Sequence, residues 1–82
     1  MKIDIRYFAS VREALGSGES VETQAATLAD LRDELIARGG PHASALARGK
    51  AVRMAMDQVM RPESTALRDG GEVAFFPPVT GG

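Results

Sequence analysis

The sequence predicts an α+β fold in which one mixed β-sheet is covered on one face by one main helix. Two observations support this class. Segments near both ends of the chain alternate polar and apolar residues, as β-strands do. Between them runs one apolar stripe at helical spacing, and glycine and proline clusters separate the segments.

The opening segment, residues 2–8, has the period of a strand. Ile3, Ile5 and Tyr7 fall on one face, and the residues between them are polar. Phe8 breaks this pattern, because its phase places an aromatic side chain on the polar face. The strand is therefore predicted to bury one face and to carry Phe8 on the other.

A short helix and a second strand are predicted next. Ser10 is the expected N-cap of the helix, Glu13 completes a capping box, and Gly16 ends the helix. A second short strand over residues 19–24 follows the turn at residues 16–18. The chain is thus expected to begin with a strand, a short helix and another strand.

The main helix is predicted to begin at Thr27, with Asp30 at its third position. Its apolar stripe consists of Leu28, Leu31, Leu35 and Ile36. The Gly-Gly-Pro sequence at residues 39–41 is expected to end this helix. Residues 42–49 are predicted to form a helical turn over the surface.

The last part of the chain is predicted to be mostly strand. Residues 51–57 alternate again, residues 58–60 add a return strand, residues 68–71 form a turn, and residues 72–76 form the last strand. The apolar faces of these strands comprise Val52, Met54, Met56, Val73 and Phe75.

This order of elements, with two short opening strands and one long central helix, favours a ubiquitin-like β-grasp. A ferredoxin-like fold would need a second long helix before the last strand, and residues 61–71 are too short and turn-rich for one. We expect a β-grasp domain over residues 1–76 and an extended C-terminal Gly-Gly tail over residues 77–82. A chain of 82 residues builds only a small core, so no roomy active-site pocket is expected.

Composition argues against several partners. A net charge of −1 lacks the basic excess that nucleic-acid binding requires. No apolar run is long enough to cross a bilayer, and the alternating N-terminus is unlike a signal peptide, so the expected location is the cytoplasm. The chain has no cysteine, which removes disulfides, thiolate metal sites and thiol nucleophiles.

The usual catalytic side chains are almost absent. His42 is the only histidine and is expected to be solvated in a loop, because no partner for a metal site or a catalytic triad accompanies it. Ser10 and Thr27 are better explained as helix caps than as nucleophiles. The carboxylates are scattered singly, and no glycine cluster has the spacing of a phosphate loop, so no metal or acid–base site is predicted.

The final segment, "FFPPVTGG", is the exception. Pro77 and Pro78 lack N–H groups, so they end the strand ladder and favour an extended polyproline II path. Gly81 and Gly82 have no Cβ, so the segment can enter a narrow channel and present the Gly82 carboxylate. Residues 77–82 would reach about 20 Å. We expect this tail to be mobile in the free protein; a frayed end or an artificial addition is the alternative.

An exposed apolar patch is also predicted. Phe8 and Phe76 both fall on the polar faces of their strands, and Met60 is placed to extend the same surface. Arg12 is expected to add a charge at the rim, unless it belongs to an ordinary solvated helix face. Isolated exposed apolar residues are the alternative to a binding patch.

Two motifs carry a resemblance to a known family. They are "FASVRE" at residues 8–13 and "LRDGGEVAFFPPVTGG" at residues 67–82, whereas residues 37–50 have no sharp signature. With the β-grasp pattern and the length, the chain resembles the MoaD/ThiS group of ubiquitin-like sulfur carriers, and within it the small subunits of molybdopterin synthases.

The resemblance implies a chemical cycle and its partners. An E1-like adenylating enzyme would use ATP and Mg²⁺ to adenylate the Gly82 carboxylate, and a sulfurtransferase donor would convert it to a thiocarboxylate. The tail would insert into the large synthase subunit, in a 2+2 heterotetramer, and pass sulfur to cyclic pyranopterin monophosphate to form the molybdopterin dithiolene. The inserted tail residues would be Pro77, Pro78, Val79, Thr80 and Gly81. The patch would dock the large subunit, and this chain would bind no cofactor and contribute no catalytic side chain to the sulfurtransferase.

Other functions are compatible with the same fold and the same C-terminal carboxyl group. The nearest alternative is a sulfur carrier for thiamin thiazole synthesis, and others are a sulfur carrier for tRNA thiolation or a ubiquitin-like modifier joined to lysines. A plain β-grasp adaptor, in which the tail has no chemistry, is the remaining alternative. Deleting Gly82 would leave such an adaptor unharmed.

Overall fold

The computed structural model describes residues 1–77 of the chain. Its elements, in order, are β1 (Lys2–Tyr7), α1 (Ala9–Leu15), β2 (Gly18–Glu22), α2 (Leu28–Ile36), α3 (Gly40–Leu46), β3 (Arg53–Met56), β4 (Val59–Met60) and β5 (Glu72–Phe76). Every predicted strand is present. The expectation of a mobile tail falls, apart from Pro77, outside the described residues.

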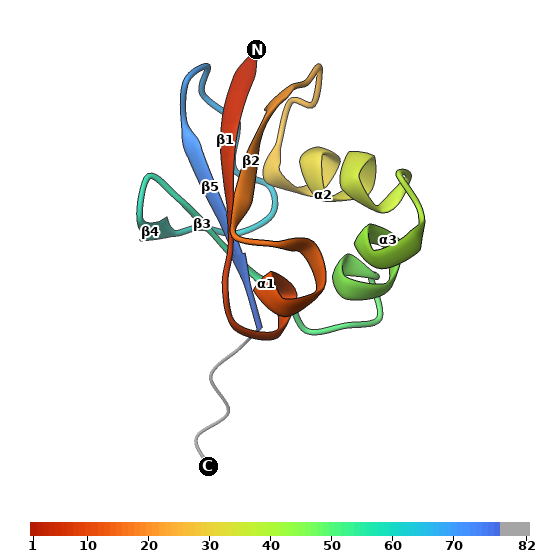
Figure 1. Ribbon diagram of the computed structural model, residues 1–82. Helices are drawn as coiled ribbons and strands as arrows, with labels where there is room; N and C mark the ends of the chain where they lie inside the picture. The colour runs from red at the N-terminus through yellow and green to blue at the C-terminus, as the bar shows by residue number, and fades with distance from the viewer. Residues whose placement is uncertain (78–82) are drawn as a thin grey trace.

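The strands form one mixed sheet, in the order β2-β1-β5-β3-β4. β1 pairs with β5 in parallel, and the other neighbours are antiparallel. Figure 1 shows α2 and α3 on one side of this sheet, with α1 at the end of β1. The predicted α+β class, a mixed sheet covered on one face, is confirmed.

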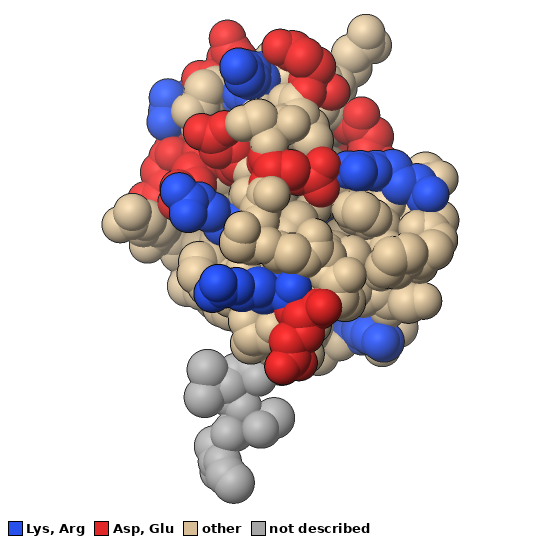
Figure 2. All heavy atoms as spheres, viewed as in Figure 1, with Lys and Arg blue, Asp and Glu red and all other residues tan. Residues whose placement is uncertain are grey.

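The predicted helical turn at residues 42–49 is helical but begins earlier, because Gly40–Leu46 form the helix α3. α2 ends at Ile36 and is followed by Ala37 as its C-cap, and α3 begins at Gly40 after Gly39 adopts φ 75°. The Gly-Gly-Pro sequence therefore ends one helix and begins the next. Leu46, near the end of α3, is completely buried. Figure 2 shows that the surface over α3, whose sequence is GPHASAL, is largely free of charged side chains.

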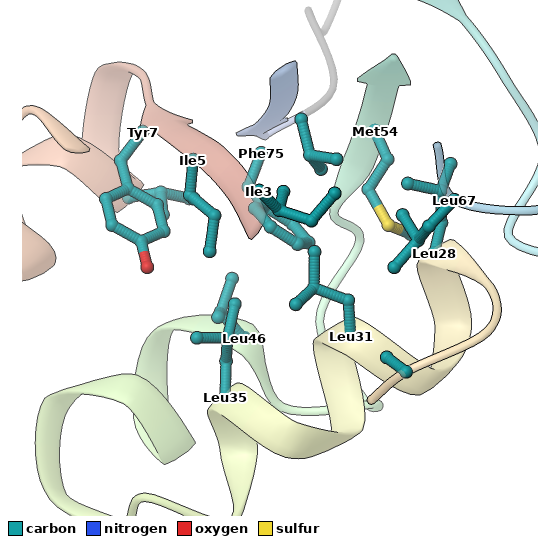
Figure 3. Close-up of a cluster of buried hydrophobic side chains, with 13 residues drawn as sticks. Ile3, Ile5, Tyr7, Leu28, Leu31, Leu35, Leu46, Met54, Leu67 and Phe75 are labelled. Carbon is teal, nitrogen blue, oxygen red and sulfur yellow. The ribbon is translucent and has the colours of Figure 1, made fainter. Parts of the chain in front are cut away.

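The core lies between the sheet and the two helices α2 and α3 (Figure 3). Its completely buried large side chains are Ile3, Ile5, Tyr7, Leu28, Leu31, Leu46, Val73 and Phe75. The rings of Tyr7 and Phe75 stack with their centroids 6.2 Å apart. Full burial of each such apolar side chain contributes about 1.5–3 kcal/mol, so this single cluster provides most of the driving force for folding.

The two predicted helix caps had different outcomes. The Thr27 hydroxyl accepts a hydrogen bond from the Asp30 N–H at 3.2 Å, which confirms the N-cap of α2. The capping box at Ser10 is wrong, because α1 begins two residues earlier than this cap implies, with Phe8 as its N-cap and no side-chain cap. The Phe8 N–H donates to the Phe75 carbonyl at 3.1 Å, so pairing with β5 fixes where the strand ends and the helix begins.

Arg32 is a buried arginine that ties α2 to the segment after α3. Only 3% of its surface is exposed. Its Nε donates to the Leu46 carbonyl at 2.8 Å, and its Nη2 donates to the carbonyls of Ala47 at 2.7 Å and Lys50 at 3.1 Å. Since the last carbonyls of a helix have no partner within it, the guanidinium satisfies the Leu46 carbonyl, which would otherwise be buried without a hydrogen bond.

We expect Arg32→Lys to lower the free energy of unfolding by about 1–3 kcal/mol, because an ammonium cannot reproduce the planar fork that bonds three carbonyls at once. Arg48→Lys is the matched control, since Arg48 is more exposed, and its loss should stay within about 1 kcal/mol. Denaturant unfolding measures both. Equal losses for the two variants would contradict a structural role for the buried guanidinium.

Candidate functional site

Phe8 and Phe76 lie side by side on the outer face of the sheet, the face turned away from α2 and α3. Tyr7 pairs with Phe75 in the parallel ladder. Phe76 is the next residue of β5, and Phe8 directly follows β1 with an extended backbone, so both point to the opposite face. Phe8 is 47% exposed, and Phe76 is half-buried. Neither side chain belongs to the core, so the phase deduced from the sequence is correct for both.

Met60 reaches the same face from the edge of the sheet. The β3–β4 pairing sets Met60 opposite Ala55, and the β3–β5 pairing sets Ala55 opposite Ala74. Directly paired residues share a face, so Met60, which is 55% exposed, continues the apolar surface. We call this surface the outer patch; it consists of Phe8, Ala55, Met60, Ala74 and Phe76.

Charged residues surround the outer patch. Arg53 is paired with Phe76, and Arg6 forms an ion pair with Glu72 at 3.6 Å. A hollow of about 370 Å³ beside Phe8 is lined by Arg6, Phe8, Gln58, Glu72 and Ala74. Arg12, the predicted rim charge, is exposed on α1, and its backbone N–H donates to the Phe8 carbonyl at 3.2 Å. The sequence did not identify the other rim charges, because they follow from the strand register.

Pro77 begins the predicted tail, and it is half-buried. It lines a groove of about 310 Å³ together with residues of α1, α3 and the segment before β3. The polar side chains in this groove are Ser10, Ser44 and Lys50. The other predicted tail residues and Gly82 lie outside the described residues.

His42 is not in a solvated loop, which corrects the sequence-based expectation. It belongs to α3, and its Nε2 lies 3.3 Å from Oε2 of Glu19. The Tyr7 hydroxyl donates to the same oxygen at 2.9 Å, and Arg38 Nη1 donates to Oε1 at 2.8 Å. This cluster links β1, β2, α3 and the segment after α2. It was missed because it depends on where α3 packs.

The cluster shifts the pKa values of its members. Burial acts to raise the pKa of Glu19, but hydrogen bonds from Arg38, Tyr7 and His42 outweigh it, so this pKa falls below its usual value. Burial, and then the bond to Glu19, raise the pKa of Tyr7 far above its usual range. Glu19 is therefore ionised and Tyr7 neutral near pH 7, which suits a structural contact rather than proton transfer.

Among residues 1–77, no group of three or more His, Cys, Asp or Glu side chains is arranged to hold a metal ion. Likewise, none of the described helices is both long and apolar enough to cross a membrane.

Protein families and curated relatives match the chain along nearly all of its length. The model of the ThiS family matches residues 5–82. Proteins named molybdopterin synthase sulfur carrier subunit are 41% identical in Escherichia coli and 38% in Haemophilus influenzae, each over 81 residues that cover 98% of this chain and 99% of the relative. The protein of that name in Mycobacterium tuberculosis is 39% identical and covers 100% of this chain. The resemblance seen at both ends of the sequence is confirmed.

Solved structures agree with the fold. SAMP1 from Haloferax volcanii has a TM-score of 0.78 and 25% identity, with all of both chains covered. A putative molybdopterin converting factor, subunit 1, from Pyrococcus furiosus has a TM-score of 0.78 and 26% identity over 96% of this chain and 99% of its own. A complex of subunits 1 and 2 of molybdopterin-converting factor from Helicobacter pylori contains a chain with a TM-score of 0.69 at 24% identity, with all of both chains covered. The β-grasp prediction is thereby confirmed.

The lowered pKa of Glu19 predicts acid sensitivity. Because its pKa is lower in the folded state, Glu19 adds stability above its ordinary pKa of 4.5, and this contribution is lost as the pH falls through the folded-state value. Glu19→Gln should therefore lose less unfolding free energy than the wild type between about pH 6 and about pH 3.

The matched control is Glu22→Gln, which changes an exposed glutamate in the same strand. Its loss of stability with falling pH should follow that of the wild type. Thermal unfolding followed by circular dichroism over this pH range compares the three proteins. Parallel curves for Glu19→Gln and the wild type would rule out Glu19 as a source of acid sensitivity.

Proposed function

This chain belongs to the ThiS family, and on that premise we propose that it is the sulfur carrier subunit of a molybdopterin synthase. The observation that carries the proposal is similarity along almost the whole chain. Three proteins with that name are 38–41% identical, and the match covers 99% of each of them. In this role the reacting group is the carboxyl group of Gly82, within the stretch matched by the family.

The chemistry of the carrier follows from the weak reactivity of a carboxylate. An adenylating partner joins a Gly82 carboxylate oxygen to the α-phosphate of ATP, with Mg²⁺, and pyrophosphate leaves. Sulfide-level sulfur from a sulfurtransferase donor then attacks the acyl carbon and displaces AMP, which gives a thiocarboxylate. Its nucleophilic sulfur attacks cyclic pyranopterin monophosphate, and water cleaves the acyl–sulfur bond, which releases the carrier as a carboxylate. A second charged carrier supplies the other sulfur of the dithiolene.

The outer patch is the docking surface in this proposal. Phe76 ends β5 within the patch, and Pro77 follows it directly, so a partner bound to the patch lies beside the start of the tail. The Helicobacter pylori neighbour was solved as a complex of subunits 1 and 2, which supports a large subunit as the partner here. We infer a 2+2 heterotetramer with that subunit, and separate encounters with the E1-like enzyme and the sulfur donor.

Docking of the outer patch and insertion of the tail contribute to the binding free energy with opposite signs. In this proposal residues 78–82 become ordered on insertion, and ordering five residues opposes binding by roughly 5–10 kcal/mol of backbone entropy. Apolar area buried at the outer patch contributes about 25 cal/mol per Å² toward offsetting this cost. The outer patch therefore provides the favourable binding free energy, and the tail carries the carboxyl group that reacts.

A protein modifier is the second candidate function. SAMP1, the small archaeal modifier protein 1 of Haloferax volcanii, matches the chain over its whole length with a TM-score of 0.78. An activated carboxylate of the same kind can acylate a lysine. Incubation with the cognate activating enzyme, ATP and a sulfide source distinguishes the two. Intact mass that records replacement of one oxygen by sulfur supports the carrier, whereas isopeptide-linked products without thiocarboxylate support the modifier.

Truncation of the outer patch should weaken binding to the large subunit. Phe76→Ala is expected to cost about 2 kcal/mol or more, because a large aromatic side chain at the centre of an interface is a typical hot spot. Met60→Ala should weaken binding in the same direction. Isothermal titration with the cognate large subunit measures both effects.

Val59→Ala is the matched control for Met60→Ala. The two residues are neighbours in β4, they are 49% and 55% exposed, and successive strand residues point to opposite faces. Val59→Ala should leave the affinity unchanged. Equal effects at the two positions would mean that the outer patch is not the docking surface.

The terminal glycines should be required for sulfur transfer but not for docking. Deletion of Gly82 shortens the reach by about 3 Å, which is enough to misplace a sulfur that must lie about 3–3.5 Å from its target. Gly81→Val should block entry into a narrow channel. Both variants should fold and bind through the outer patch while failing in a reconstituted synthase assay. A Gly82-deleted protein that still makes molybdopterin would refute the proposed function.

A further inference from the structure

β2 is an edge strand whose outer backbone groups are available to another strand. The Tyr7 N–H donates to the Ser17 carbonyl, and the Thr23 N–H donates to the Met1 carbonyl. In an antiparallel pair the hydrogen-bonded residues alternate, so every second residue from Ser17 to Thr23 bonds to β1. The intervening residues therefore direct their N–H and C=O groups away from β1. They are Gly18, Ser20 and Glu22. Within residues 1–77, these outward groups have no backbone hydrogen bond outside the β1–β2 ladder.

A groove lies along the inner side of this open edge, between β2 and α2. Its volume is about 320 Å³, and it is lined by Val21, Glu22, Thr23, Leu31, Glu34, Leu35 and Arg38. The apolar members come from both β2 and α2. A strand added along β2 would direct every second side chain into this groove, so the backbone edge and the groove are positioned to bind the same segment.

The charges around the groove favour a basic occupant. Glu34 accepts a hydrogen bond from the Thr23 hydroxyl, a neutral donor, and no ion pair to it occurs within residues 1–77. Arg38 is already paired with Glu19 at 2.8 Å. The amino group of Met1 lies 3.9 Å from Glu22, which leaves Glu34 as the uncompensated charge. In Figure 2, acidic and basic side chains are interspersed over the upper part of this face.

We propose that the β2 edge binds an extended, basic segment of a partner protein, which adds to the sheet as an antiparallel or parallel strand. Apolar side chains of this segment occupy the groove, and a lysine or arginine between them pairs with Glu34. The site is independent of the proposed function. β2 and β4 form opposite edges of the sheet, so a segment on β2 leaves Met60 and the rest of the outer patch free for a second partner.

The test uses the full chain labelled with ¹⁵N and a synthetic peptide, acetyl-Val-Thr-Lys-Thr-Val-amide, in which Val, Lys and Val share one face of a strand. Amide shifts are expected in β2 and along α2, and not in the outer patch. The matched peptide with Glu in place of Lys should bind at least about fivefold more weakly. Glu34→Gln should remove most of this difference while it retains a side-chain oxygen for Thr23.

Two variants at one position test the backbone contact. Ser20→Pro removes an N–H that points away from β1, so the β1–β2 ladder can persist, whereas Ser20→Ala keeps this N–H. Both lose the hydroxyl that bonds to Asp4, which makes them a matched pair. Ser20→Pro should weaken peptide binding about tenfold or more relative to Ser20→Ala, with circular dichroism confirming that both are folded.

Three outcomes would overturn the proposal. The first is equal affinity of the two Ser20 variants, or no shift in β2 at millimolar peptide. The second is a set of shifts that maps to the outer patch instead of to β2 and α2. The third is a concentration-dependent shift of β2 in the protein alone, which would assign the edge to a second copy of the chain.

Discussion

The parallel pairing of β1 with β5 is the constraint on which the rest of the structure depends. It joins strands from opposite ends of the chain at the middle of the sheet. On the inner face, this ladder aligns Tyr7 with Phe75, and both side chains are almost completely buried. On the outer face, the same register sets Phe8 beside Phe76. One set of backbone hydrogen bonds therefore defines both the core and the surface that we assign to docking.

Two polar clusters orient the helices on this sheet. Arg32 extends from α2 to the carbonyls at the end of α3, and Glu19 in β2 receives contacts from Tyr7, Arg38 and His42. A chain of this size has a small apolar core, and the hydrophobic effect that stabilises this core is not directional. Buried hydrogen bonds depend on direction, so these clusters fix how the helices lie.

Sequence patterns predicted the features that depend on local geometry. A strand with one buried face must alternate apolar and polar residues, so the sequence shows that Phe8 falls on the polar face. The Thr27 cap depends only on residues three positions apart in the chain. The Ser10 cap failed because α1 begins where pairing with β5 ends, which is a contact between distant parts of the chain. The burial of Arg32 and the environment of His42 depend on the packing of α3. The residues of the outer patch could thus be predicted, whereas its charged rim required the register.

The position of Phe76 has a consequence for every partner in the proposed cycle. β5 carries Phe76 in the outer patch and continues directly into Pro77, so a partner that holds the patch also fixes the origin of the segment that follows. Residues 77–82 span about 20 Å when extended. The reach of this segment is therefore measured from the same origin, Pro77, for every partner. In the proposed cycle, every enzyme that uses this chain must therefore place its reacting centre within this reach of the surface that holds the outer patch.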